Sequence, residues 1–204
     1  ASQLPEKIGN LLDESRWLAL GAVALFLAMA FWGFSKDDPG WSHAVVSGNL
    51  HNPTGHAGAW IADLMLYLFG FSAWWWIVLL VMFMWWGFRR LNSPLGHADR
   101  RPLYLALSGF GVLLVASSAL EALRFYSLKV ELPLAPGGLL GIEAGRLLEH
   151  LLGYTGSTLV LLAAMAAGWS IFSGMSWLWA FERLGEVLEA FGGFFFGLVD
   201  RWRD

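Results

Sequence analysis

Four long apolar stretches limit what this chain can fold into more than any other feature. A helix needs about 20 apolar residues to cross the roughly 30 Å hydrocarbon core of a bilayer. We expect such spans at approximately residues 17–35, 71–90, 103–123 and 156–180. The composition agrees, because 57% of the 204 residues are hydrophobic and only 14% are charged. The sequence therefore predicts an all-α membrane protein with a four-span domain in residues 1–180.

The second apolar stretch, residues 59–88, is too long for one straight span. As a single helix it would reach about 45 Å at 1.5 Å per residue. Gly70 and Ser72 offer a break in the middle of this stretch. We therefore divide it into a short helix at 59–69, lying at the membrane interface, and a span that begins at residue 71.

Positive charges collect on one side of the predicted membrane. Nine of the 13 Lys and Arg residues lie near the chain ends or between the second and third spans, and the other four lie in the two remaining loops. Short cytoplasmic loops carry an excess of Lys and Arg, which predicts cytoplasmic N and C termini and two periplasmic loops. Tryptophans near the span ends fit the aromatic belts of membrane interfaces.

Shifting the sequence by 83 residues aligns two similar segments. The alignment pairs Pro53 with Pro136, Gly55 with Gly138, Gly58 with Gly141 and Gly70 with Gly153. The second segment also contains an amphipathic helix at 139–152, a pattern typical of helices that lie along a membrane surface. We expect two parallel repeats, each a hairpin of span, turn-rich loop, periplasmic interfacial helix and returning span. Gly70 and Gly153 would set the breaks.

The last part of the chain, residues 181–204, reads as an amphipathic tail. Its polar face would carry Glu182, Arg183, Glu186 and Glu189, and its apolar face Phe181, Leu184, Leu188 and Phe191. This pattern predicts a helix on the cytoplasmic membrane surface.

Few residues suggest catalysis or metal binding. The chain has no cysteine, which excludes disulfides and thiolate sites. His51, His56 and Asp63 offer imidazole and carboxylate ligands, but their spacing matches no zinc motif. The sequence has no G-x-x-x-x-G-K-[ST] phosphate loop and no Ser-His-Asp order. We expect no catalytic residues, no metal and no cofactor in this chain, and no enzymatic activity.

The first outer loop has a specific order of residues. It contains Ser35, Asp38, Pro39, Trp41 and Ser42, then His51-Asn52 and Gly55, then Gly58-Ala59-Trp60 and Ala62-Asp63. The second outer loop contains Pro136-Gly137-Gly138 and Gly141, and residues 167–177 read AGWSIFSGMSW. Together these residues resemble the N-terminal four-span membrane domain of the FtsK family of bacterial DNA translocases.

The resemblance implies a multi-pass anchor in the bacterial inner membrane, concentrated at the division septum. Such a domain binds other division proteins in the membrane and periplasm and couples cell division to chromosome segregation. In the family, a long linker joins it to a hexameric motor that uses ATP and Mg²⁺ to pump DNA. The linker and the motor are not among these 204 residues. The family's contact with DNA would therefore be made only by the motor. The resemblance also implies a homo-oligomer, with a hexamer as the expected number.

We expect the two outer loops to form a docking surface rather than an active site. Asp38, Pro39, Trp41, Gly55, Gly58 and Trp60 would shape the first loop, and Gly137, Gly138 and Gly141 the second. The unrepeated turn Asp37–Trp41 and the pair His51 and Asn52 would form a partner's footprint. Asp63 and Arg146 occupy equivalent repeat positions with opposite charges. They either face each other or remain two separate solvated charges.

Two further expectations concern polar residues of the spans. Glu121 lies at the outer end of the third span with Arg124 three residues later, and both are expected to reach water. The alternative function is a small-solute channel or transporter built from the duplicated hairpin. It would need polar residues facing inward, and the spans offer few: Ser108, Ser117, Ser118 and Ser170.

Overall fold

The computed structural model describes residues 6–44, 50–91, 103–125 and 131–201, and these contain helices and loops but no strand. The helices are α1 (Glu6–Trp32), α2 (Gly55–Phe69), the 3₁₀ helix η1 (Gly70–Trp74), α3 (Trp75–Leu91), α4 (Leu103–Arg124), α5 (Gly138–Ser173) and α6 (Trp177–Arg201). Four segments are long and apolar enough to cross a membrane: Glu14–Trp32, Gly55–Gly87, Leu103–Arg124 and Gly138–Ser173. The predicted all-α architecture with four spans is confirmed.

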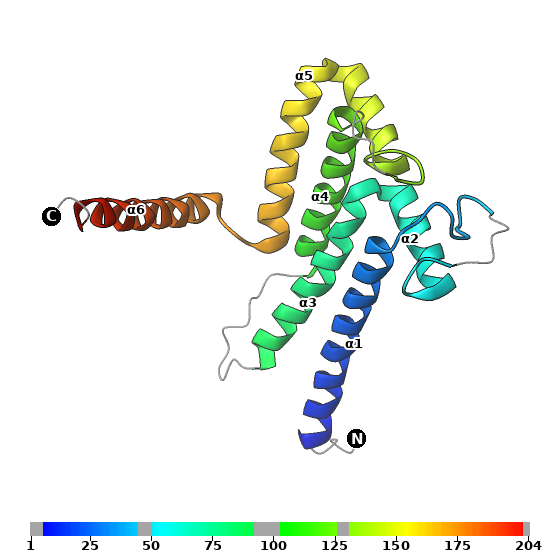
Figure 1. Cartoon of the computed structure of the whole chain (residues 1–204), viewed down its shortest axis with the longest axis horizontal. Coiled ribbons are helices and arrows are strands. Elements are labelled where there is room, and N and C mark those ends of the chain that lie inside the picture. Colours follow the sequence, from blue (N-terminus) through cyan, green and yellow to red (C-terminus); the bar gives the residue numbers. More distant parts are fainter. Residues whose placement is uncertain (1–5, 45–49, 92–102, 126–130, 202–204) are drawn as a thin grey trace.

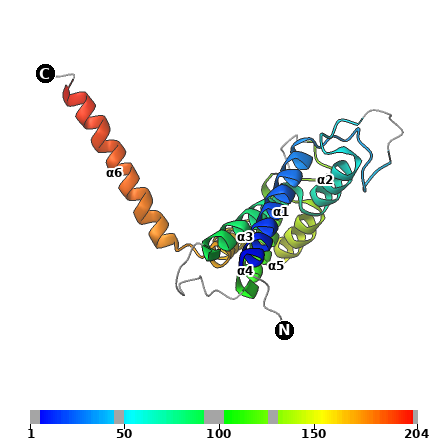
Figure 2. The same ribbon diagram turned by 90° about the horizontal axis from the view of Figure 1, so that it is seen from below.

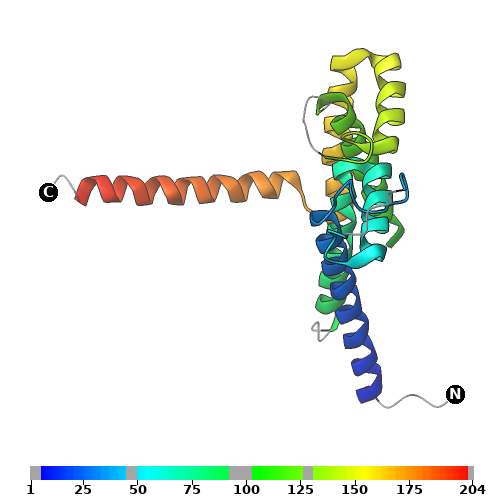
Figure 3. The same ribbon diagram turned by 45° about the vertical axis from the view of Figure 1, so that its right-hand side comes forward.

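The four spans lie side by side in a bundle, and α6 projects away from it (Figures 1 and 2). α4 and α5 form the most extensive helix pair, α1 packs against α3, and α2 bridges α1 and α5. The described parts of the two outer loops lie near each other and near α2, well away from the start of α1 (Figure 3).

Small residues and aromatic rings hold α3, α4 and α5 together. A Cβ atom on Gly168 of α5 would lie 2.7 Å from the backbone nitrogen of Leu113 in α4, so these helices approach closely. Beside this contact, the ring centroids of Phe110 and Phe172 are 5.5 Å apart, and those of Phe110 and Trp76 are 5.3 Å apart. Small residues at such crossings let membrane helices pack by van der Waals contact, without a hydrophobic drive from water.

The backbone confirms the duplicated hairpin and its two glycine breaks. Gly55 and Gly138, which begin the two short helices, both have positive φ, at 76° and 61°. Gly70 ends α2 with φ 59° and ψ −138°, and Gly153 interrupts α5 with φ 66° and ψ 172°. Because residues with a Cβ rarely adopt such angles, glycine at aligned positions produces the same change of direction in both repeats.

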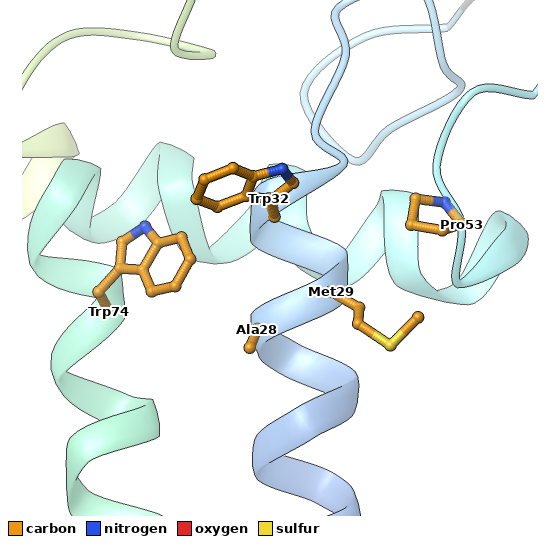
Figure 4. Close-up of a pocket in the computed structure, with 5 residues that line it drawn as sticks. All are labelled: Ala28, Met29, Trp32, Pro53 and Trp74. Carbon is orange, nitrogen blue, oxygen red and sulfur yellow. The ribbon is translucent and has the colours of Figure 1, made fainter.

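The two repeats differ after the break. In the first, η1 separates α2 from α3, and α2 crosses the end of α1 (Figure 4). In the second, α5 turns at Gly153 and its two parts fold back beside each other (Figure 1).

The observed helix boundaries differ from the expected ones at several ends. The two short helices begin at Gly55 and Gly138, a little before the expected 59 and 139. The last long helix ends at Ser173 instead of residue 180, and α6 begins at Trp177 instead of residue 181. Residues 1–5 and 202–204 of the expected membrane domain and tail lie outside the described residues.

Candidate docking loop and the polar junction beneath it

Asp38 fastens the beginning of the first outer loop to its end. Its side chain is buried, with 2% of its surface exposed. The carboxylate accepts hydrogen bonds from the backbone N–H groups of His51 (2.7 Å) and Asn52 (2.8 Å), and His51 Nδ1 lies 3.2 Å from it. Hydrogen bonds to an ionised acceptor are stronger than neutral ones. Asp38 therefore holds the two ends of the loop together, and its carboxylate is not available to a partner.

Asn52 joins the same loop to the helices on either side of it. Its buried side-chain amide donates to the carbonyl of Ala30 in the last turns of α1 (2.9 Å), a region where helix carbonyls lack helical partners. Its carbonyl oxygen accepts from the backbone N–H (3.0 Å) and the hydroxyl (2.5 Å) of Thr54, just before α2. A Cβ on Gly58 would collide with the Thr54 hydroxyl. Gly58 and Asn52 thus form the inner side of the loop.

Asp63 holds the middle of the loop against α2. Its buried carboxylate accepts from the backbone N–H (2.5 Å) and the hydroxyl (2.9 Å) of Ser42. His43 Nδ1 lies 3.7 Å from the same carboxylate. Arg146, by contrast, is well exposed and pairs with Glu143 at 3.3 Å. The hypothesis that Asp63 and Arg146 face each other is therefore wrong, because each side chain has a partner within its own repeat.

Other residues of the loop are presented outward. Trp41 and Trp60 are 49% and 44% exposed, and the His51 side chain is 58% exposed. Trp41 is braced by Tyr67 of α2 in an edge-to-face contact with ring centroids 5.2 Å apart. Pro39 and Gly55 are partly exposed beside them. The residues predicted for the first loop thus divide into a buried group (Asp38, Asn52, Gly58, Asp63) and an outward group (Pro39, Trp41, His51, Gly55, Trp60), which we call the aromatic rim.

We expect Asp38→Ala to loosen this loop without unfolding the bundle. The substitution leaves two backbone N–H groups without their acceptor, which costs about 1–3 kcal/mol of local stability for each group that stays buried. Hydrogen exchange of the amides of His51 and Asn52 should accelerate in the detergent-solubilised chain. Lys36→Ala, which removes an exposed side chain of the same loop, is the control and should leave exchange unchanged. Equal protection of these amides in both variants would contradict the role of Asp38 in holding the loop ends together.

The glycines of the second outer loop lie in the interior. Gly137, Gly138 and Gly141 are all buried. A Cβ on Gly141 or Gly137 would collide with the carbonyl oxygen of Ser118 in α4, and one on Gly138 would lie 2.6 Å from the backbone nitrogen of Gly70. These glycines shape the second loop from within by letting three backbones meet. They offer no surface to a partner.

The buried carboxylate of Glu121, which is not among the predicted site residues, lies where these three backbones meet. Glu121 accepts hydrogen bonds from the hydroxyl (2.7 Å) and backbone N–H (3.2 Å) of Ser72, and the Ser72 and Ser117 hydroxyl oxygens are 2.6 Å apart. The backbone N–H groups of Phe71 and Gly137 also face this carboxylate. Glu121 therefore offers a hydrogen-bond acceptor to backbone N–H groups at the break after α2 and in the second outer loop.

The expectation that Glu121 reaches water is wrong, because the first repeat covers it and leaves it 9% exposed. Arg124 turns away instead, donating two hydrogen bonds to the Thr158 hydroxyl (3.1 and 2.9 Å) and lying 4.2 Å from the centre of the Tyr154 ring. One signal could have revealed the contact: a carboxylate in an apolar span needs a donor, and Ser72 follows a predicted break.

No arrangement among the described residues suggests catalysis. No group of three or more His, Asp or Glu side chains there could hold a metal ion. One surface groove among the described residues has a volume of about 310 Å³ and is lined by Ala28, Met29, Trp32, Pro53 and Trp74 (Figure 4). It lies between the last turns of α1, Pro53 of the first outer loop and Trp74 of η1. Apart from the indole N–H groups of Trp32 and Trp74, its lining offers no polar side chain that could orient a substrate.

The family match and the individual relatives point to the same group of proteins. Residues 9–185 match the family described as the 4TM region of DNA translocase FtsK/SpoIIIE. The chain is 43% identical over 196 residues to DNA translocase FtsK 2 of Ralstonia nicotianae, covering 94% of this chain and 25% of that relative. DNA translocase FtsK of Shewanella oneidensis is 32% identical over 165 residues, covering 81% of this chain and 18% of the relative.

The chain thus spans about a quarter or less of the length of these relatives, and it matches their membrane region and not the ATPase motor domain. No solved structure matches. The four apolar spans and the family match over residues 9–185 agree. This multi-pass membrane chain belongs to the family of four-transmembrane regions of FtsK/SpoIIIE DNA translocases.

Proposed function

We propose that this chain is the membrane anchor and division-protein interaction module of a DNA translocase. It would lie in the bacterial inner membrane, with both termini cytoplasmic, and concentrate at the division septum. The family match and the curated relatives named DNA translocase support the association with a motor. The motor would act on DNA in the cytoplasm, and this chain would hold it at the septum as part of a homo-oligomer.

The aromatic rim is the observation that carries the interaction role. Buried aspartates hold the loop in one conformation, while Trp41 and Trp60 remain about half exposed beside it. Exposed tryptophans on a rigid surface are typical anchors of protein contacts, since they bury a large area at little entropic cost. A periplasmic or membrane division protein would dock on this rim.

The alternative of a solute channel gains no support from the serines that would line it. The Ser117 hydroxyl oxygen lies 2.6 Å from that of Ser72, Ser118 donates to the carbonyl of Phe69 (3.3 Å), and Ser170 donates to that of Met175 (2.9 Å). Hydroxyl groups used in this way are not arranged along a water-filled path. The anchor therefore remains the proposed function.

Trp41→Ala combined with Trp60→Ala should reduce recruitment to the septum. In a relative such as the Ralstonia translocase, this chain would replace the native membrane region and carry a fluorescent fusion. We expect the septal fraction to fall several-fold while the amount in the membrane stays constant. Leu147→Ala, an exposed apolar residue of the second repeat, is the matched control and should localise normally. Unchanged septal localisation of the double variant would refute the aromatic rim as the docking site.

A further inference from the structure

We propose that the first outer loop contains a pH-sensitive latch, formed by Lys36, Ser42, His43 and Asp63, which closes when His43 binds a second ring proton. Lys36 and His43 lie seven residues apart in the loop, and Asp63 belongs to α2. The latch is separate from the hydrogen bonds of Asp38, which join other parts of the loop. It concerns the conformation of the loop and holds whether or not the aromatic rim binds a partner.

Three contacts connect the residues of the latch in a row. His43 Nε2 lies 2.8 Å from the backbone carbonyl oxygen of Lys36. On the other side of the ring, His43 Nδ1 lies 3.0 Å from the Ser42 hydroxyl oxygen. That oxygen in turn lies 2.9 Å from Asp63 Oδ1. All three distances are within hydrogen-bonding range, so the row joins the beginning of the loop to a buried carboxylate on α2.

The number of protons in this row depends on the charge of His43. A carbonyl oxygen and a carboxylate only accept hydrogen bonds, and a hydroxyl group has one proton to donate. A neutral imidazole also has one ring proton, which leaves two protons for three contacts. An imidazolium ring supplies the third proton. Its Nε2–H then donates to Lys36 and its Nδ1–H to Ser42, while the Ser42 hydroxyl donates to Asp63.

The surroundings of the ring favour a proton on His43. Imidazole is a much stronger base than a carboxylate, so the third proton belongs on His43 and not on Asp63. From α2, the buried carboxylate of Asp63 faces the ring at 3.7 Å from Nδ1. From the loop, Lys36 faces the ring through its carbonyl oxygen, and the carboxylate of Asp38 lies beside His51. The ring is therefore close to a negative charge and to acceptors for both of its N–H groups.

The closed loop should become less stable as the pH rises. The closed loop makes the contacts that hold the second proton of His43, and the open loop does not make them. Proton binding therefore stabilises the closed loop. This stabilisation is present below about pH 6.5, where histidine ordinarily titrates, and it is lost as the pH rises through and above that range. At higher pH the beginning of the loop would be held to α2 less tightly.

His51 offers a comparison within the same loop, because it also lies beside a buried aspartate. Its Nδ1 lies 3.2 Å from Asp38 Oδ1, and its side chain is 58% exposed. A neutral ring with its single proton on Nδ1 satisfies this contact. The hydrogen bonds of His51 therefore require no second proton, in contrast to those of His43.

The test measures hydrogen exchange of the Ser42 backbone amide, which donates to Asp63 Oδ2, in the complete detergent-solubilised chain. Protection factors, each relative to an unstructured peptide at the same pH, are compared at about pH 5.5 and about pH 7.5, on either side of the ordinary titration of histidine. We expect protection to be several-fold higher at the lower pH. His43→Gln should abolish this difference, and His51→Gln, the matched control, should retain it.

Asp63→Asn distinguishes the proton count from a simple attraction between charges. Its amide oxygen can accept from the Ser42 N–H while its amide nitrogen donates to the Ser42 hydroxyl, so three protons are present even when His43 is neutral. We expect the Ser42 amide of this variant to stay protected at both pH values. Loss of its protection at both values would show that charge attraction holds the loop and would overturn the proposal. An unchanged pH difference in His43→Gln would overturn it as well.

Discussion

Gly70→Val is expected to lower the free energy of unfolding of this membrane domain by about 2–6 kcal/mol. Two costs contribute. The backbone at Gly70 has φ 59° and ψ −138°, and holding a residue with a side chain there costs about 1–3 kcal/mol. The new side chain would also meet the backbone of Gly137 and Gly138, and such overpacking costs a further 1–3 kcal/mol or so. Thermal unfolding of the detergent-solubilised chain measures the loss.

Two matched controls separate these costs. Gly153→Val imposes similar strain, because φ is 66° there, but no neighbouring atom lies within 4 Å of a Cβ. Gly111→Val has neither a positive φ nor a close neighbour and should be nearly neutral. We expect the order Gly70 > Gly153 > Gly111 in the loss of stability. In cells, Gly70→Val should disturb septal recruitment while the other spans still insert. Equal losses at Gly70 and Gly153 would contradict the close approach of the two repeats.

Glu121→Ala is expected to lower the free energy of unfolding by about 2–6 kcal/mol. It leaves the hydroxyl and backbone N–H of Ser72 without their acceptor, and each buried donor left unpaired costs about 1–3 kcal/mol. Water is scarce inside a membrane bundle and cannot easily replace the carboxylate. Glu121→Gln keeps an acceptor oxygen of the same shape and should lose much less. The readout is the unfolding midpoint of each variant in the same detergent.

A double-mutant cycle identifies the partner. Ser72→Ala removes the hydroxyl, so Ser72→Ala with Glu121→Ala should cost less than the sum of the two single variants. Thr158→Ala, which affects Arg124 on the neighbouring side of α4, serves as the control and should be additive with Glu121→Ala. Additivity of the Ser72 and Glu121 variants would show that the buried hydrogen bonds do not couple the repeats.

Hydropathy and glycine spacing predicted much of this fold. Four spans follow from the length of an apolar helix that crosses lipid, and all four are present. The 83-residue shift placed Gly70 and Gly153 at the breaks because positive φ strongly favours glycine, and such positions stand out in a sequence. The shift did not foresee η1, since the residues that follow the two breaks are similar in composition but differ in packing.

The candidate site was predicted less well, because burial and pairing depend on segments far apart in the chain. Asp38 and Asn52 are buried by each other and by α1, so residues proposed as a footprint turned out to be fasteners. Asp63 finds Ser42 at a separation of 21 residues, and Glu121 finds Ser72 at a separation of 49. The hydrophobic periodicity of a sequence does not reveal contacts between residues so far apart in the chain.

Two kinds of information thus separate in this protein. Local chemistry along the chain was sufficient for the membrane class, the number of spans and the positions where the helices break, because each depends on segment length or on the φ of one residue. The folded arrangement was needed for three further features. These are the burial of Asp63 and Glu121, the close contact of Gly70 with Gly138, and the sideways direction of α6. These features arise where two or three helices meet, and their energies come from partners that the linear sequence does not place side by side.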